Sequence, residues 1–116
     1  MIRILNFTED NLLATLAENK LESDDYIIIR NEFQKIIAKN KKVNWYFEMK
    51  DFKGWQPKAL WEDLKLDIDH SKDLHKVAMV GDEKWEKWMT QIMKPFVKAE
   101  YFDISEKEKA LEWLRN

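Results

Sequence analysis

The feature that most constrains the fold is a regular change of hydrophobic period along the chain, from the alternation typical of strands to the 3.6-residue repeat typical of helices. The chain opens with two apolar segments, Ile2 to Phe7 and Leu12 to Ala17, joined by a short polar link. Such a link fits an antiparallel hairpin, and Asp10 and Asn11 within it can adopt the turn conformations that glycine otherwise supplies. We therefore expect the first two strands to pair antiparallel.

A helix is predicted directly after this hairpin. Ser23 is expected to be its N-cap, followed by Asp24 and Asp25 in the turn where the helix dipole favours acids. The apolar residues that recur at helical spacing are Tyr26, Ile29, Phe33, Ile36 and Ile37. The three lysines and the asparagine of residues 39–42 suit the C-terminus of this helix.

The rest of the chain repeats the order strand then helix three times. Strands are expected at residues 43–49, 77–80 and 97–102, and in the first of these Val43, Trp45, Phe47 and Met49 share one face. Helices are expected to begin at Pro57, near Glu83, and after Ser105 as an N-cap. Short links from each helix to the next strand predict parallel strands with right-handed crossovers. The predicted fold is one α/β domain over residues 1–116, with a five-stranded, mostly parallel sheet, one antiparallel edge strand and four helices.

Composition excludes several functional classes. The formal net charge is −2 and the arginines are only Arg3, Arg30 and Arg115, which disfavours a nucleic-acid partner. The chain has no cysteine, so disulfides and thiolate sites are excluded, and its two glycines cannot build a P-loop or a dinucleotide turn. No apolar run approaches the ~20 residues of a membrane span, and the N-terminus does not read as a signal peptide. We expect a cytoplasmic protein without a cofactor.

Two polar groups are candidates for chemistry. Residues 67–75 contain His70 and His75, but their spacing does not place two imidazoles on one helical face, so a solvated loop is favoured over a metal site. Asp51 and Asp82 each follow a predicted parallel strand, at the sheet edge where ligands usually bind. A small hydrolase or lyase using both carboxylates is the weakest of the functional hypotheses, because no nucleophile, base and oxyanion donor can be named together. Each aspartate is instead expected to cap the turn that follows it.

Aromatic residues concentrate in the second and third predicted helices. Six tryptophans occur in 116 residues, and Trp85, Trp88 and Met89 lie on one stripe of the third helix beside lysines. Trp61 and Leu64 lie on the apolar face of the second helix, and Trp55 lies in the loop before it. These stripes either pack against the sheet, as every helix in such a fold must, or leave part of their surface for an apolar ligand or a membrane. The sequence leaves both interpretations open.

Five segments carry a resemblance to a known family: KLESDDY at 20–26, DFKGW at 51–55, ALWED at 59–63, VAMVGD at 77–82 with Trp85, and ALEWL at 110–114. Together they resemble the SpoIIAA-like family, small bacterial proteins related in fold to STAS domains and more distantly to lipid-carrying CRAL-TRIO domains. The resemblance implies a five-stranded sheet with four helices, no known enzymatic reaction, and association with a small ligand or lipid. Where the family commonly has glycine before the Lys-Leu of the first segment, this chain has Asn19.

The same resemblance bears on regulation by phosphorylation. Anti-anti-sigma relatives of this fold carry a phosphorylatable serine near the start of the helix after the third strand. The equivalent stretch, Asp51 to Leu60, contains neither serine nor threonine, so no hydroxyl is present there to modify. A phosphorylation switch at that position is not expected.

The leading hypothesis is a non-catalytic binding or regulatory module. In this hypothesis the protein binds an apolar small molecule or a lipid, or it associates peripherally with a membrane. The residues expected to form the binding surface are Trp55, Trp61, Leu64, Trp85, Trp88 and Met89. The alternative is a STAS-type protein–protein interaction module, since exposed apolar patches mark protein partners as readily as lipids. A homodimer is expected from the prevalence of two-fold pairing among oligomers.

Overall fold

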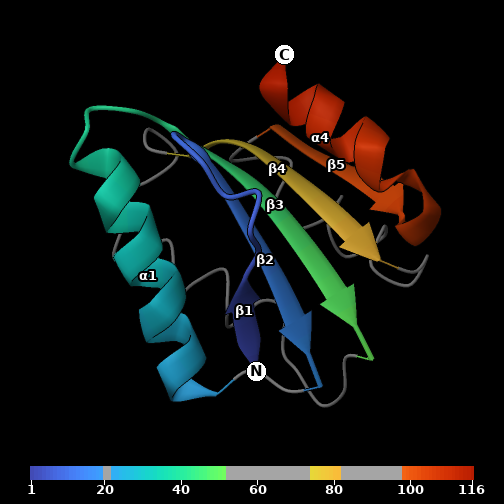
Figure 1. Cartoon of the computed structure of the whole chain (residues 1–116), viewed down its shortest axis with the longest axis horizontal. Coiled ribbons are helices and arrows are strands. Elements are labelled where there is room, and N and C mark those ends of the chain that lie inside the picture. The colour runs from blue at the N-terminus through green and yellow to red at the C-terminus, as the bar shows by residue number, and fades with distance from the viewer. Residues whose placement is uncertain (20–21, 52–73, 82–97) are drawn as a thin grey trace.

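The computed structural model describes residues 1–19, 22–51, 74–81 and 98–116. In the described part of the chain, five strands form one sheet in the order β1-β2-β3-β4-β5, where β1 and β2 pair antiparallel and the other neighbours pair parallel (Figure 1). The strands are β1 Ile2–Ile4, β2 Leu12–Glu18, β3 Val43–Lys50, β4 Leu74–Gly81 and β5 Lys98–Asp103. The sheet is therefore mixed, with its antiparallel pair at one edge, and the predicted N-terminal hairpin is confirmed.

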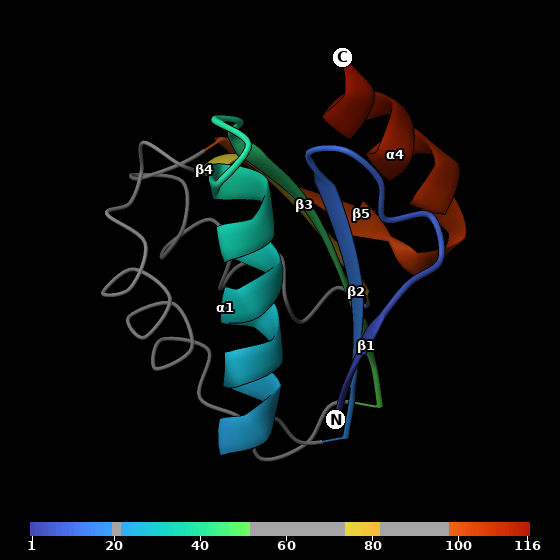
Figure 2. The ribbon, with the colours of Figure 1, turned by 60° about the vertical axis from the view of Figure 1, so that its left-hand side comes forward.

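Helices cover both faces of the sheet. Helix α1 (Ser23–Ile37) lies on one face, and helix α4 (Lys107–Arg115), preceded by the 3₁₀ turn η1 (Ile104–Glu106), lies on the other (Figure 2). The described residues thus hold two α-helices where the sequence predicts four. The helices expected after Pro57 and near Glu83 fall outside the described residues. No helix in the described part of the chain is long and apolar enough to cross a membrane.

The start of α1 differs from the prediction. Ser23 is the first helical residue, and the N-cap is Glu22. The backbone N–H of Glu22 donates to Asp25 Oδ2 at 2.8 Å, while Asp25 Oδ1 accepts the N–H of Ile2 at 3.0 Å. The carboxylate of Asp25 therefore joins the helix start to β1, which a serine hydroxyl at position 23 is too short to do.

Asparagine and aspartate serve at the turns where the backbone is left-handed. Positive φ angles occur at Asp10 (52°), Asn19 (59°), Asn40 (60°) and Asp51 (50°) among the described non-glycine residues. Each follows or precedes a strand or helix end, and these two residue types tolerate this conformation better than other non-glycine residues. Asn19 thus adopts the backbone conformation that favours glycine at this position.

The sheet separates two apolar cores. Under α1, Phe33 packs edge-to-face on Trp45, and Trp45 packs on Phe47, with ring centroids 5.0 and 4.8 Å apart. The face predicted for this strand is confirmed, because Val43, Trp45, Phe47 and Met49 all belong to the α1-side core. The core on the α4 side contains Leu12, Ala14, Tyr46, Ala78, Val80, Ala110 and Leu114. Alternation along β3 therefore supplies side chains to both cores.

Two further boundaries differ from the prediction. Strand β4 begins at Leu74, so His75 lies in a strand and not in the expected loop. Ser105 lies within η1, where its N–H and its hydroxyl both donate to Asp103 Oδ2, at 3.0 and 2.7 Å. The side chain of Asp103 therefore caps the turn, and the N-cap of α4 is Glu106. At both expected serine caps, Ser23 and Ser105, the carboxylate of a nearby aspartate takes part in the capping interaction.

Candidate functional site

The surface residues that the sequence predicts are not among those described. Trp55, Trp61, Leu64, Trp85, Trp88 and Met89 all lie outside the described residues, as does Asp82. Asp51 is exposed and directly follows β3 with a left-handed backbone. The proximity of Asp51 to Asp82 therefore remains a prediction. The same holds for ligand or membrane binding by the six surface residues.

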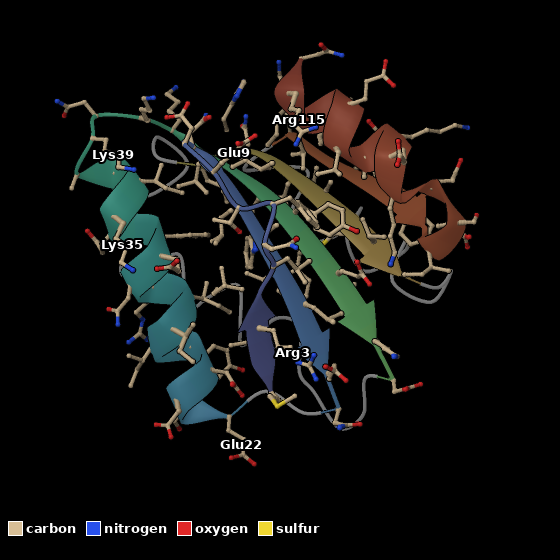
Figure 3. The ribbon with its side chains drawn as sticks, viewed as in Figure 1. Arg3, Glu9, Glu22, Lys35, Lys39 and Arg115 are labelled. Atoms are coloured by element: carbon tan, nitrogen blue, oxygen red, sulfur yellow. The ribbon has the colours of Figure 1, made fainter. Side chains whose placement is uncertain are left out.

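The described residues form a polar pocket at the amino edge of the sheet, where β2, β3 and β4 begin. Its volume is about 440 Å³, and it is lined by residues 9–12, Asn44, His75 and residues 114–116. The hairpin turn supplies one wall and the C-terminal end of α4 supplies another. In Figure 3, Glu9 and Arg115 lie near each other at this edge, with Arg115 on the side of α4.

A β-bulge places His75 in this pocket. Val43 pairs with Leu74 and Asn44 pairs with Lys76, so His75 is an extra residue between two successive pairs of β3 and β4. Bulges of this kind re-aim a side chain and are frequent beside functional sites. No motif in the sequence points to this pocket, although the apolar residues from Leu74 onward indicate a strand that begins there.

The protonation pattern of His75 follows from its neighbours. Asn44 Nδ2 donates to the carbonyl oxygen of Leu114 at 2.9 Å, which orients the amide and leaves Asn44 Oδ1 as an acceptor. His75 Nδ1 lies 3.1 Å from Asn44 Oδ1 and must therefore carry the proton of that hydrogen bond. The lone pair of the neutral ring is then on Nε2. Burial, followed by the charges of Lys76, Lys98 and Lys42, lowers the pKa of His75.

Lys76, on β4, contacts the C-terminal end of α4 as Asn44 does. Its side chain is largely buried, its Nζ donates to the carbonyl oxygen of Trp113 at 3.0 Å, and it lies 5.2 Å from the centroid of the Trp113 ring. Asn44 and Lys76 thus satisfy two of the last carbonyls of α4, which have no partner within the helix. A cation at the C-terminal end of a helix is also favoured by the helix dipole.

Both carboxylates of the pocket lie close to a cation. Asp10 is hydrogen bonded to Lys41, and this bond holds the pKa of Asp10 below its ordinary value. Glu9 is 3.8 Å from Arg115, a loose and exposed pair. Asp10 thus has Lys41 as its cationic neighbour, from outside the pocket lining, and Glu9 has Arg115 from within it.

A second polar group lies under α4. The Tyr46 hydroxyl donates to Glu48 Oε1 at 2.7 Å, and Lys107 Nζ lies 3.2 Å from Glu48 Oε2. Burial, and then the hydrogen bond and charge of Glu48, raise the pKa of Tyr46. These contacts join β3 to the start of α4. Among the described residues, no group of three or more acidic or histidine side chains is placed to hold a metal ion.

This arrangement, a single mixed sheet with helices on both faces and its polar side chains engaged in structural contacts, defines an α/β module. A family model described as SpoIIAA-like matches residues 12–115, and the chain belongs to this family. A similar solved structure is an uncharacterized protein from the DUF3478 family with a SpoIIAA-like fold from Shewanella loihica PV-4. It is 28% identical, with a TM-score of 0.67, over 98% of this chain and 92% of that one.

Among curated proteins, none matches this chain significantly. The family match and the fold indicate a non-catalytic regulatory or interaction module of STAS type.

Proposed function

We propose that this chain is a binding module that holds an apolar small molecule or a lipid, at a membrane surface or free, without catalysing a reaction. The contacting residues are Trp55, Trp61, Leu64, Trp85, Trp88 and Met89. Their side chains combine large apolar area with the polar edge of indole, which suits both an apolar pocket and a lipid interface.

The observation that carries this proposal is the direction of β3 and β4. They are parallel neighbours and end at the same sheet edge, at Lys50 and Gly81. The sequence segments that hold the six residues therefore begin side by side. Trp55 is four residues beyond Asp51, and Trp85 is four residues beyond Gly81. In open α/β sheets, this carboxyl edge is where ligands usually bind.

Native mass spectrometry of gently purified protein, without detergent, tests for a retained ligand. A lipid-like adduct lost in the double variant Trp85→Ser/Trp88→Ser supports the proposal. The matched control is Ile27→Ser/Ile28→Ser, which removes exposed apolar area from α1 instead.

The folded state of both variants is checked by circular dichroism and urea denaturation. If the tryptophan variant is unfolded, these residues belong to the core and the proposal fails. If it is folded and retains the adduct, these two residues are not the contact surface.

A protein–protein interaction module is the second candidate, favoured by the outer face of α1. Ile27 and Ile28 are 48% and 39% exposed there, whereas Ile29 and Phe33 of the same helix are buried in the core. Sedimentation equilibrium tests for a homodimer: a dimer that dissociates in Ile27→Lys/Ile28→Lys supports this candidate. A monomer at all concentrations removes self-association and leaves only a heterologous partner.

A further inference from the structure

We propose that β1 is an interaction edge at which a second copy of this chain pairs antiparallel, around a two-fold axis at Ile4, so that the two sheets become continuous. The contact is made by the backbone of an edge strand. It therefore rests neither on ligand binding by the tryptophan segments nor on the outer face of α1.

The first support is the direction of the backbone groups of β1. The N–H of Leu5 donates to the carbonyl oxygen of Ala14 on the β2 side, at 2.8 Å. Bonded and non-bonded pairs alternate along an antiparallel ladder, so Ile2 and Ile4 direct their N–H and C=O groups away from β2. The N–H of Ile2 agrees with this, because it donates to Asp25 Oδ1 at 3.0 Å and not to β2.

The second support is that the outward groups of Ile4 are unpaired. Within the described part of the chain, β2 is the one strand beside β1, and neither the N–H nor the carbonyl oxygen of Ile4 has a hydrogen-bond partner. At Ile2 the outward N–H is already occupied by Asp25, which leaves only the carbonyl oxygen there. The free part of this edge is therefore centred on Ile4.

The third support is the nature of the side chains along β1. Edge strands are commonly protected by lysine or proline, and the three residues of β1 contain neither. Ile4 is 37% exposed, and Arg3, labelled in Figure 3, points to the opposite face of the sheet. Arg3 Nη2 lies 3.1 Å from Glu18 Oε1, so its charge is compensated within the chain. Neither side chain opposes the addition of another strand.

The free groups of this edge are complementary to themselves, which favours a second copy as the occupant. In an antiparallel pair, a residue with both groups directed outward exchanges two hydrogen bonds with one residue opposite it. Ile4 meets this requirement from both sides when it faces the partner's Ile4, and the two apolar side chains then form a cross-strand pair. The same register places Asn6, whose N–H has no partner among the described residues, opposite the partner's Ile2 and its free carbonyl oxygen. Such an interface is isologous, as in most homodimers.

The first test is amide hydrogen exchange of the full chain, measured by NMR over a dilution series with sedimentation equilibrium on the same samples. The paired edge is short, so we expect a reversible dimer that dissociates on dilution. The N–H of Ile4 should be protected in proportion to the fraction of dimer, because it has an acceptor only there. The N–H of Leu5, which is bonded to Ala14 in either state, should not change with concentration.

The register is tested with the variants Ile4→Lys and Ile4→Glu. Each variant alone places two like charges opposite each other at the two-fold axis, so we expect at least a tenfold increase in the dissociation constant of the dimer. An equimolar mixture of the two variants places opposite charges there and should restore dimerisation as a mixed dimer. The matched control is Ile104→Lys, which changes an isoleucine of η1 that is 44% exposed and should leave the dimer unaffected.

The backbone contribution is tested with Ile4→Pro. Proline is tolerated at an edge strand where the N–H faces away from the ladder, and it removes the donor that the second copy requires. We expect this variant to remain folded by circular dichroism and to be a monomer at concentrations where the wild type is a dimer. If it is unfolded, the lysine and glutamate variants decide the matter.

The proposal is overturned by a monomer at all concentrations, by a dimer in which the N–H of Ile4 stays unprotected, or by Ile4→Lys and Ile4→Glu variants that dimerise as the wild type does. A dimer that is lost in Ile27→Lys/Ile28→Lys and kept in Ile4→Lys would assign self-association to α1 instead. None of these results bears on the retained lipid adduct, so failure here is distinct from failure of the ligand-binding proposal.

Discussion

At the scale of single residues, the buried hydroxyl of Thr15 has one clear task. It accepts a hydrogen bond from Trp45 Nε1 at 3.0 Å, between β2 and β3, and Thr15 is 0% exposed. Replacing Thr15 by Val leaves the indole N–H buried without an acceptor, so we expect the free energy of unfolding to fall by about 1–3 kcal/mol. Urea denaturation measures this loss, and Thr15→Ser, which keeps the oxygen, should lose less. Equal losses in the two variants would contradict this role.

Tyr46 predicts a dependence of stability on alkaline pH. Its pKa is raised above the ordinary value of 10.0 by burial and by Glu48. Above pH 10 the unfolded chain therefore releases a proton that the folded chain retains, and the contribution of Tyr46 to stability decreases as the pH rises. The expected slope is up to about 1.4 kcal/mol per pH unit.

Comparing unfolding free energies of wild type and Tyr46→Phe between pH 8 and pH 11 measures this contribution. The variant lacks the hydroxyl, so it should be less stable at pH 8 and the gap should narrow above pH 10. A constant gap across this range would show that Tyr46 ionises equally in both states.

The role of a single residue could be predicted where it depends only on contacts with its neighbours along the chain. The turn role of Asp10 follows from local backbone preference, and its positive φ agrees. The serine caps at Ser23 and Ser105 were wrong because carboxylates of Asp25 and Asp103 take part in the capping instead. Three-dimensional contacts such as that of Asp25 with β1 decide this choice, and the sequence does not display them.

At the scale of elements, α4 depends on two strands to close its C-terminal end. Asn44 supplies a donor to the carbonyl of Leu114 and an acceptor to His75. In Asn44→Ala we expect faster hydrogen exchange in the last turn of α4 and a loss of about 1–2 kcal/mol in stability. The matched control is Asn11→Ala, because the side chain of Asn11 donates to the carbonyl of Lys42 at the same edge and not to a carbonyl of α4. Increased exchange of α4 in both variants would show a general loosening of this edge.

Strand and helix positions were predicted well where the hydrophobic period is long. The helix over residues 23–37 and the strand over residues 43–50 fall where their apolar residues recur. The start of β4 was missed because the preceding sequence is rich in Asp and Lys, which conceals Leu74 as a strand residue. A bulge arises from pairing with a neighbouring strand, so the pocket that depends on it could not be found from one strand alone.

At the scale of the whole molecule, the two cores share one sheet, so we expect them to unfold as one cooperative unit. Leu13 belongs to the core under α1, and Leu114 belongs to the core under α4. We expect Leu13→Ala and Leu114→Ala each to lower stability by about 2–5 kcal/mol, with additive effects in the double variant to within about 0.5 kcal/mol.

Circular dichroism and tryptophan fluorescence should report one coincident unfolding transition in each variant. Two separated transitions would show instead that the faces of the sheet unfold independently.

The strand order of the sheet has a consequence for how this protein is made. Because β1 to β5 lie in the sheet in the order in which they occur along the chain, each strand pairs with the one synthesised just before it. On the ribosome, the sheet can therefore grow in one direction, and its growing edge always awaits the next segment to emerge. None of the five described strands has to be inserted between two that are already paired, so a nascent chain need not reopen finished strand pairing to complete this sheet.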